Sequence, residues 1–131
     1  MIIGSMFESY ASSINHDYFV KPGGEPISRA EFDVIFERER QMLEEGWSAE
    51  YDDQYILDEL ARAAAIYATP PISRIHWDGE PAPATWPWDP KWWKPTDRRR
   101  DLVKAGALIL AEIERLDRAA ARAIETGPEG A

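Results

Sequence analysis

The sequence predicts a mainly α-helical fold, in which a core of three helices carries a long connection rich in Trp and Pro. Three observations predict it: apolar residues recur at helical spacing in three segments, a capping box precedes the first segment, and a proline pair ends the second. The chain has 131 residues, 44% of them hydrophobic, and no Cys. We therefore expect one domain over residues 1–131 whose core needs no disulfide and no thiolate metal site.

The first helix is predicted to begin after Ser28. Ser28 and Glu31 have the spacing of a capping box, in which each side chain accepts a hydrogen bond from the backbone N–H of the other residue. Gly46 is expected to end this helix. Its apolar residues share one face: Phe32, Ile35, Phe36 and Leu43. In residues 1–27 the apolar residues follow no sustained helical or strand spacing. We therefore expect an irregular segment there, with a short strand at residues 16–21.

The second helix is predicted to start at Asp52 or Asp53, because carboxylates there complement the positive end of the helix dipole. Pro70 and Pro71 stop it. Its predicted apolar face consists of Ile56, Leu57, Leu60, Ala61, Ala64 and Tyr67. The connection that follows, residues 72–95, is long, yet its many aromatic residues argue against disorder.

The third helix is the longest, and we expect it to be capped by Thr96, to run to about Ala123 and to lie antiparallel to the second. The helical core then spans residues 28–123, and residues 124–131 form a flexible tail. The repeating apolar residues of this helix are Leu102, Gly106, Ile109, Ile113 and Leu116, flanked by Val103, Leu108 and Leu110. They form a wider surface than one partner helix covers, which predicts a homodimer with this helix at its interface.

Charge and hydropathy exclude two classes of partner. The chain holds 24 Asp and Glu against 15 Lys and Arg, a formal net charge of −9, and such a chain repels the phosphates of duplex nucleic acid. The longest apolar stretch, residues 105–113, is half the length that a bilayer requires. We therefore expect neither duplex nucleic acid nor a membrane as a partner, and a cytoplasmic location.

Enzyme chemistry finds little support in the sequence. Glu114 and Asp117 have the Glu-x-x-Asp spacing with which helical nucleotide pyrophosphohydrolases hold magnesium, but the chain has no Glu-x-x-Glu motif, and both residues also fit an exposed charged face. The two histidines, His16 and His76, are far apart, and no Cys is available as a nucleophile. We expect no catalytic residues, no metal and no cofactor, and hence no enzyme.

Tryptophan is concentrated in one segment. Five of the six Trp residues lie within residues 77–93, where prolines separate them. Such rings either close the core over the second and third helices or form a platform on which a base stacks, and both interpretations stay open. The four Trp residues that we consider for the platform are Trp86, Trp88, Trp92 and Trp93.

Basic residues follow this segment at the start of the third helix. Arg98 and Arg99 lie at the positive end of the helix dipole, where basic side chains are unfavourable. An anion bound at this end of the helix would make them favourable. With Lys94, they are candidates to hold a phosphate. The alternative is that they form surface ion pairs with neighbouring aspartates.

Several motifs together resemble an uncharacterised family of small bacteriophage and prophage proteins, over about residues 34–118. The motifs are Glu-Arg-x-Arg-Gln at residues 37–41, Glu-Gly-Trp at 45–47, Asp-Asp at 52–53, Trp-Pro-Trp at 86–88 and Trp-Trp-Lys-Pro at 92–95. Relatives in this family usually have His where this chain has Tyr51 and Tyr55, so a metal site around the Asp-Asp pair is not expected here.

The chain is also similar, at fewer positions, to the repeat module of ryanodine receptors. In that module a helix runs into Gly-Trp and an acidic turn, and a later helix begins near Asp-Arg. The corresponding positions here are Gly46-Trp47, Asp52-Asp53 and Asp97-Arg98. This resemblance implies a helical ligand-binding or interaction module, for which nucleotides are plausible ligands.

Together these features predict a non-enzymatic phage or prophage accessory protein, in the host cytoplasm, that binds and sequesters a small nucleotide-derived or phosphorylated signal of a host defence system. The predicted ligand-binding residues are Trp47, Asp52, Asp53, Trp86, Trp88, Trp92, Trp93, Lys94, Arg98 and Arg99. One alternative is an acidic interaction protein that inhibits a host defence protein or other nucleic-acid-binding complex through carboxylates such as Glu37, Glu39, Glu44 and Glu45. The other is a degenerate magnesium-dependent nucleotide pyrophosphohydrolase.

Overall fold

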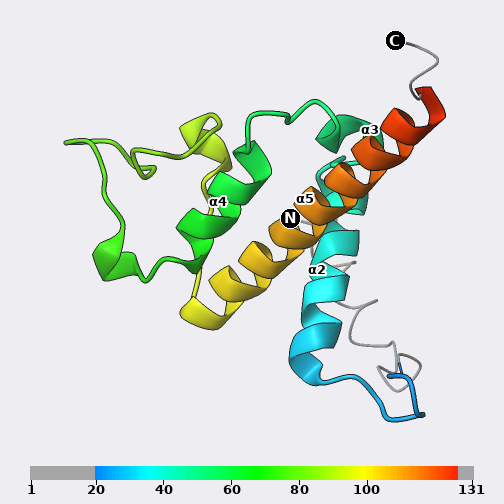
Figure 1. The fold of residues 1–131 in the computed structure, drawn as a ribbon. Coiled ribbons are helices and arrows are strands. Elements are labelled where there is room, and N and C mark those ends of the chain that lie inside the picture. Colours follow the sequence, from blue (N-terminus) through cyan, green and yellow to red (C-terminus); the bar gives the residue numbers. More distant parts are fainter. Residues whose placement is uncertain (1–19, 127–131) are drawn as a thin grey trace.

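The computed structural model of the chain describes residues 20–126, and this part is mainly helical, as predicted. It contains α2 (Arg29–Glu44), α3 (Ala49–Asp52), α4 (Glu59–Ala68) and α5 (Arg98–Thr126), with short 3₁₀ helices η2 (Pro71–Ser73) and η3 (Pro90–Trp92) in the Trp/Pro-rich connection (Figure 1). Within residues 20–126, no helix combines the length and apolar character needed to cross a bilayer.

Helix α5 is the central element, because α4 packs along one side of it and α2 crosses another (Figure 1). The end of α4 meets the start of α5, where Arg98 donates to the Ala68 carbonyl at 2.6 Å, so the two helices are antiparallel as expected. Small alanines on both helices let them approach closely. The buried cluster consists of Leu60, Ala63, Ala64, Tyr67, Ala105, Leu108 and Ala111.

Helix α2 begins as predicted but buries a different face. The capping box is present: the Glu31 N–H donates to Ser28 Oγ at 3.1 Å, and the Ser28 N–H donates to Glu31 Oε1 at 3.2 Å. Of the predicted apolar face, however, only Phe32 is fully buried, and Leu43 is 70% exposed. The prediction for this face is wrong because α2 meets α5 through charged side chains, and its buried residues are Phe32, Glu37, Arg38 and Gln41.

The predicted second helix begins later than expected, and a short helix precedes it. Helix α3 is capped by Ser48, whose hydroxyl accepts from the Tyr51 N–H, and α4 starts only after Asp58, which has a left-handed φ of 64°. Ile56 and Leu57, expected in the core, lie in the exposed link between the helices. Asp52 and Asp53 bind arginines of α2 and α5, so they end α3 instead of starting a longer helix.

Both ends of α5 differ from the prediction. Asp97, rather than Thr96, caps the helix, because its carboxylate accepts from the Arg100 N–H at 2.9 Å. The helix reaches Thr126, so the predicted tail begins later and otherwise lies outside the described residues. The predicted strand at residues 16–21 lies almost wholly outside them too, and Val20 forms an isolated antiparallel bridge with Pro26.

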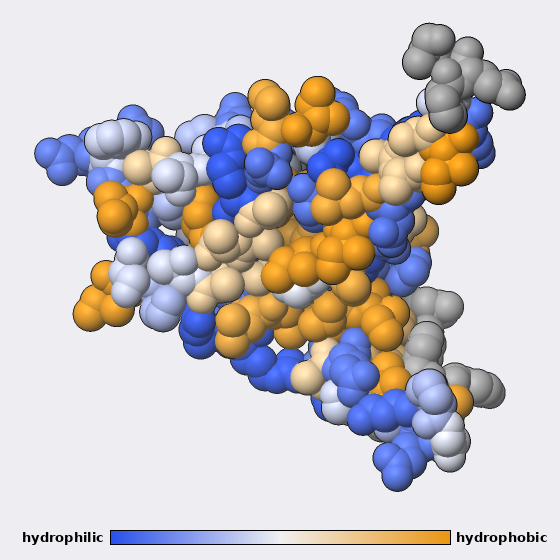
Figure 2. Space-filling model, viewed as in Figure 1, coloured by the Kyte–Doolittle hydropathy of each residue, from blue (hydrophilic) through white to orange (hydrophobic). Residues whose placement is uncertain are grey.

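The apolar stripe of α5 that is predicted to lie at a homodimer interface faces outward. Leu102, Ile109, Ile113 and Leu116 are 44–52% exposed. Figure 2 shows apolar side chains gathered over α5 on this face of the molecule. The buried face of α5 carries its alanines, Val103 and Leu108 together with several charged residues, so the most apolar side of the helix is left uncovered by its own chain.

The Trp/Pro-rich connection packs against the α4–α5 core. Trp86, Trp88 and Trp93 are half-buried on the core cluster. The Tyr67 ring lies 4.7 Å from that of Trp93 and 5.7 Å from that of Trp86. Trp77 lies outside this cluster and is 68% exposed. Three of the Trp residues therefore pack on the core. The sequence left open whether the Trp residues close the core or form a stacking platform.

The α2–α5 crossing gives a first prediction, at Gly106. A Cβ added there would lie 3.1 Å from each γ-methyl of Val34, which is tighter than ordinary contact. Ala favours a helix interior over Gly by about 1 kcal/mol. We expect Gly106→Ala to stabilise the protein by about 1 kcal/mol in a Val34→Ala background and by clearly less in the wild type, as measured by urea unfolding. Equal gains in both backgrounds would show that the helices do not touch here.

Candidate ligand-binding site

A cavity of about 530 Å³ opens between α2, the first turns of α5 and the Trp/Pro-rich connection. We call it the α2–α5 cavity. Its lining combines carboxylates, cations and aromatic rings. The carboxylates are Glu37, Glu44 and Glu45, the cations are Arg40, Lys94, Arg100 and Lys104, and the aromatic residues are Trp47, Tyr67 and Trp92.

Glu37 is the buried centre of this lining, with 2% of the residue exposed. Its carboxylate accepts two hydrogen bonds from Arg40 at 2.8 Å, one from Gln41 Nε2 at 3.2 Å and one from Arg100. Burial alone would raise the pKa of Glu37, but the hydrogen bonds and charges of Arg40 and Arg100 outweigh it and hold that pKa below its usual range. The carboxylate is therefore charged at neutral pH and joins α2 to α5.

A second set of contacts pins the connection to α5. Lys104 Nζ donates to the Lys94 carbonyl at 2.6 Å, and the Lys94 N–H donates to the Tyr67 hydroxyl at 3.2 Å. Burial lowers the pKa of Lys104, and the charge of Arg100 lowers it further. Burial also raises the pKa of Tyr67 to about 12, so this hydroxyl stays neutral. With its backbone held from both sides, Lys94 places its ammonium 5.5 Å from the centre of the Trp92 ring.

Two oxygen atoms of lining residues are buried without a hydrogen-bond partner among residues 20–126. They are Gln41 Oε1 and Glu44 Oε1. The amide of Gln41 is oriented by its N–H bond to Glu37, because the opposite orientation would set an oxygen against a carboxylate. The second oxygen of Glu44 accepts from Arg40 at 3.2 Å. A buried acceptor without a partner is unfavourable.

A smaller cavity of about 250 Å³ adjoins the first and shares Glu45, Trp47 and Trp92 with it. Its other walls are Tyr51, Tyr55, Trp88 and Asp89. The Trp88 ring lies 5.7 Å from that of Trp47 and 5.3 Å from that of Tyr55. Burial raises the pKa of Tyr55, and the neighbouring Tyr51 hydroxyl raises it further. This cavity is lined mainly by aromatic rings.

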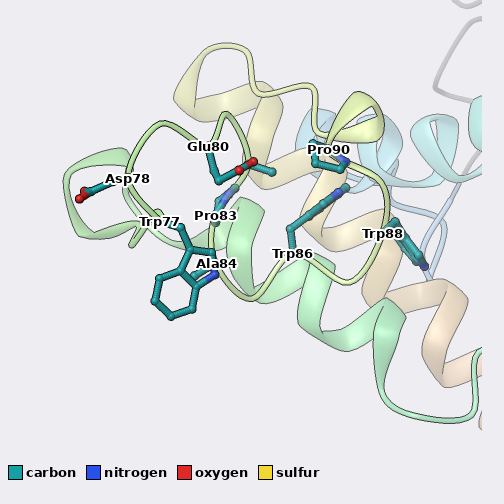
Figure 3. A pocket seen from close by; sticks show the side chains of 9 residues that line it. Trp77, Asp78, Glu80, Pro83, Ala84, Trp86, Trp88 and Pro90 are labelled. Atoms are coloured by element: carbon teal, nitrogen blue, oxygen red, sulfur yellow. The ribbon is translucent and has the colours of Figure 1, made fainter.

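Figure 3 shows a third cavity, of about 330 Å³, within the Trp/Pro-rich connection. Trp77 and Trp88 lie toward its opposite ends, and Trp86 lies between them. Its charged lining residues are Asp78 and Glu80, both acidic. This lining offers no cation to a phosphate, so the α2–α5 cavity is the stronger candidate for an anionic ligand.

The structure brings only some of the predicted site residues together. Trp47, Trp92 and Lys94 line the α2–α5 cavity, and Trp88 lines the aromatic cavity beside it. Trp93 packs in the core against Tyr67, and Trp86 lies between that core and the third cavity.

The other four predicted residues have partners away from the cavity. Arg98 donates to carbonyls at the end of α4, and Arg99 pairs with Asp33 at 2.8 Å. Asp52 accepts from Arg38 at 2.8 Å, and burial raises the pKa of Asp52 more than Arg38 lowers it. Asp53 binds Arg118 at 2.9 Å and Arg122 at 3.0 Å. These contacts hold helices together, and none of the four residues lines any of the three cavities.

Sequence reasoning missed several lining residues, chiefly Arg40, Gln41, Arg100 and Lys104. A signal existed for two of them: Arg40 and Gln41 lie three and four residues after Glu37, and four and three residues before Glu44, so these four side chains share one face of a helix. Nothing in that spacing distinguishes a solvated charged face from one that a neighbouring helix buries.

Metal chemistry finds no site in the part of the chain that the structure describes. Among residues 20–126, no group of three or more His, Cys, Asp or Glu residues is placed to hold a metal ion. Glu114, from the Glu-x-x-Asp pair, instead accepts from Arg38 at 3.0 Å.

In comparisons with known proteins, the chain matches no protein-family model, no curated protein and no solved structure.

The Glu37 network gives a pH-dependent prediction. Glu37→Gln should lower the free energy of unfolding at pH 7 by about 3 kcal/mol, because it removes the buried carboxylate that Arg40 and Arg100 share. Since the folded-state pKa of Glu37 is lowered, its stabilisation is complete above the unfolded pKa of about 4.5 and is lost as the pH falls through the folded-state value. The difference between variant and wild type should therefore shrink below about pH 4.5 in urea unfolding.

Glu39→Gln is the matched control, because Glu39 lies on the exposed side of the same helix. It should change stability by no more than about 0.5 kcal/mol. A Glu37→Gln effect that stays the same from pH 7 to pH 3 would contradict the charged network.

Proposed function

We propose that the protein binds a small nucleotide-derived or phosphorylated ligand in the α2–α5 cavity. The observation that carries the proposal is the pairing of the partly exposed Trp92 ring with cations around one cavity. Its volume of about 530 Å³ lies in the range typical of small-molecule sites. A nucleotide needs a flat surface for its base and cations for its phosphate, and this cavity offers both.

Trp92 is the stacking surface of the proposal. Trp92 is 44% exposed, whereas Trp residues in proteins are usually more buried. The ammonium groups of Lys91 and Lys94 lie 5.2 Å and 5.5 Å from the centre of its ring. Trp47 lines the same cavity. A base that stacks on Trp92 would lie next to the cations that bind its phosphate.

The phosphate is assigned to Lys94 and Arg100 rather than to Arg98 and Arg99. The side chain of Arg100 is 37% exposed, and among the described residues its guanidinium donates to Glu37 alone. A guanidinium has five N–H donors, so several are left for a phosphate. Arg98 and Arg99 are held by Ala68 and Asp33 and lie outside the cavity lining.

The biological role that we propose for this binding is sequestration of a host defence signal, without catalysis. It rests on the resemblance to phage and prophage proteins together with the chemistry of the cavity. The alternative, an inhibitor that presents carboxylates to a host complex, needs free acidic groups. Glu37, Glu44 and Glu45 all bind Arg40, which favours the ligand-binding proposal over that alternative.

Calorimetry against a panel of linear and cyclic nucleotides tests the proposal. At least one nucleotide should bind, and Trp92→Ala should weaken it by roughly 1–3 kcal/mol, the usual loss for one stacked base. Trp77→Ala is the control, because Trp77 is exposed and lines the third cavity. If no nucleotide binds, and the protein instead binds a host complex with an affinity that falls as salt is added, the acidic inhibitor replaces this proposal.

The phosphate assignment has its own test. Lys94→Ala should weaken binding of the nucleotide but leave the affinity for the matching nucleoside unchanged, because only the phosphate contact is removed. Arg99→Ala, which removes an exposed cation outside the cavity, should leave both affinities unchanged. Equal losses for nucleotide and nucleoside in Lys94→Ala would place the phosphate elsewhere.

We also propose that a second copy of the chain covers the apolar stripe of α5. Leu102 and Leu116 each lie seven residues from Ile109, so an antiparallel copy with its two-fold axis at Ile109 pairs them in both halves of the interface. The opposite charges of Arg99 and Asp117, on one edge of the stripe, then come near each other across the interface.

This homodimer is tested by sedimentation at micromolar concentration. The wild type should sediment as a dimer and Ile109→Asp as a folded monomer, because a carboxylate at the axis faces its own copy in an apolar contact. Leu43→Asp, at an exposed residue on α2, should remain dimeric. A monomeric wild type would refute the proposed interface.

A further inference from the structure

We infer that the aromatic cavity beside the α2–α5 cavity is a second ligand site, which binds a trimethylammonium group. The inference goes beyond the proposed function, because it concerns another cavity and a ligand of the opposite charge. Three features of the cavity carry it: its aromatic walls, the sign of its charge and its size. The aromatic lining residues are Trp47, Tyr51, Tyr55, Trp88 and Trp92.

Neighbouring rings of this lining are inclined to one another. The Trp88 ring makes an angle of 52° with that of Trp47 and of 55° with that of Tyr55. The rings of Tyr51 and Tyr55 meet at 77°. Such angles fit the walls of a concave site rather than a flat stack. Because the face of an aromatic ring is negative, several rings around one cavity favour a cation.

The rings are accessible to a ligand. Each of the five aromatic residues keeps part of its surface exposed, and Tyr51 and Trp92 are 43% and 44% exposed. Trp92 already attracts ammonium groups of its own chain, since Lys91 and Lys94 lie 5.2 Å and 5.5 Å from its ring centre. Neither lysine lines the aromatic cavity.

The charge of the lining favours a cation and disfavours a phosphate. Its charged members are Glu45 and Asp89, and none of the described residues that line it is Lys, Arg or His. Glu45 is paired with Arg40 at 2.9 Å. Asp89 accepts from the Lys91 N–H at 2.9 Å, which fixes its carboxylate, and it forms no ion pair within residues 20–126. The charge of Asp89 is therefore left for a cationic ligand.

Aromatic walls favour a methylated ammonium over a primary one. A primary ammonium is compact and strongly hydrated, so a site walled by rings replaces few of its hydrogen bonds to water. A trimethylammonium group has no N–H, and its methyl groups bring the positive charge against the rings. The cavity of about 250 Å³ also lies below the roughly 300–1,000 Å³ typical of drug-sized ligands, which suits a small head group.

Calorimetry with choline tests the inference on the wild-type protein. Choline should bind saturably and at least tenfold more tightly than dimethylbutanol, its neutral analogue in which a carbon atom replaces the charged nitrogen. Ethanolamine, which keeps the charge but lacks the methyl groups, should also bind at least tenfold more weakly than choline. These comparisons separate the charge from the methyl groups, and they need no variant.

A short peptide that contains trimethyllysine is titrated beside choline, with the same peptide carrying unmodified lysine as its control. Tighter binding of choline would identify a small molecule as the source of the group, and tighter binding of the methylated peptide would identify a protein side chain. Either result supports the inference, and binding of neither overturns it.

Tyr51→Ala assigns the binding to this cavity. It removes an exposed wall, and it should weaken choline at least fivefold. Tyr51→Phe keeps the ring and should bind choline within about twofold of the wild type. Trp77→Ala, at an exposed residue that lines the third cavity, should leave the affinity unchanged. Unchanged circular dichroism of each variant shows that it is folded.

Asp89→Asn tests the charge. The amide oxygen can still accept from the Lys91 N–H, so the change removes the charge and keeps the hydrogen bond. The variant should weaken choline at least threefold and leave the affinity for dimethylbutanol unchanged. Asp78→Asn removes the same charge from a residue of the third cavity, and it should change neither affinity.

Three results would overturn the inference. The first is that neither choline nor the trimethyllysine peptide binds saturably. The second is that dimethylbutanol binds as tightly as choline, which would show an apolar site without a role for the charge. The third is a choline affinity that survives Tyr51→Ala. Each of these leaves the proposed nucleotide site in the α2–α5 cavity untouched, because nucleotide affinity is measured separately.

Discussion

Buried ion pairs join α2 to the rest of the molecule beside the buried Phe32 and the Val34–Gly106 contact, and several of their members line the cavity. Arg38 lies between Asp52 at the end of α3 and Glu114 on α5, at 2.8 Å and 3.0 Å. The adjacent residue, Glu37, joins Arg40 of its own helix to Arg100 of α5. Charges removed from water must be matched by partners in good geometry, so this contact fixes the crossing of the two helices more tightly than apolar packing would.

The same requirement places functional groups and structural groups side by side. The carboxylates of Glu37, Glu44 and Glu45 all bind Arg40, and Glu37 also binds Arg100 of α5. A cavity lined only by apolar residues would fill by repacking, whereas paired charges keep their positions. Several residues that stabilise the α2–α5 contact thus also line the cavity.

The junction between α4 and α5 positions the other wall. Asp101 is fully buried and accepts from Arg74 at 3.1 Å and from the Thr96 N–H at 2.8 Å. Arg74 also donates to carbonyls at the end of α4 and lies 5.0 Å from the centre of the Trp93 ring. These contacts tie down both ends of the Trp/Pro-rich connection, so Trp92 and Lys94 are presented without a large loss of entropy when a ligand binds.

The sequence by itself determined the local features: the helical class, the capping box at Ser28, and a Trp/Pro-rich connection that packs instead of remaining open. These depend on neighbouring residues, whose preferences can be read along the chain. Only the tertiary structure decided which face of each helix is buried. It covered the charged faces of α2 and α5 and left Ile109 and Leu116 outside, because opposite charges brought together from distant segments compensate one another. For the same reason Arg100 entered the cavity lining while Arg98 and Arg99 did not: the partners Glu37, Ala68 and Asp33 lie far away in sequence.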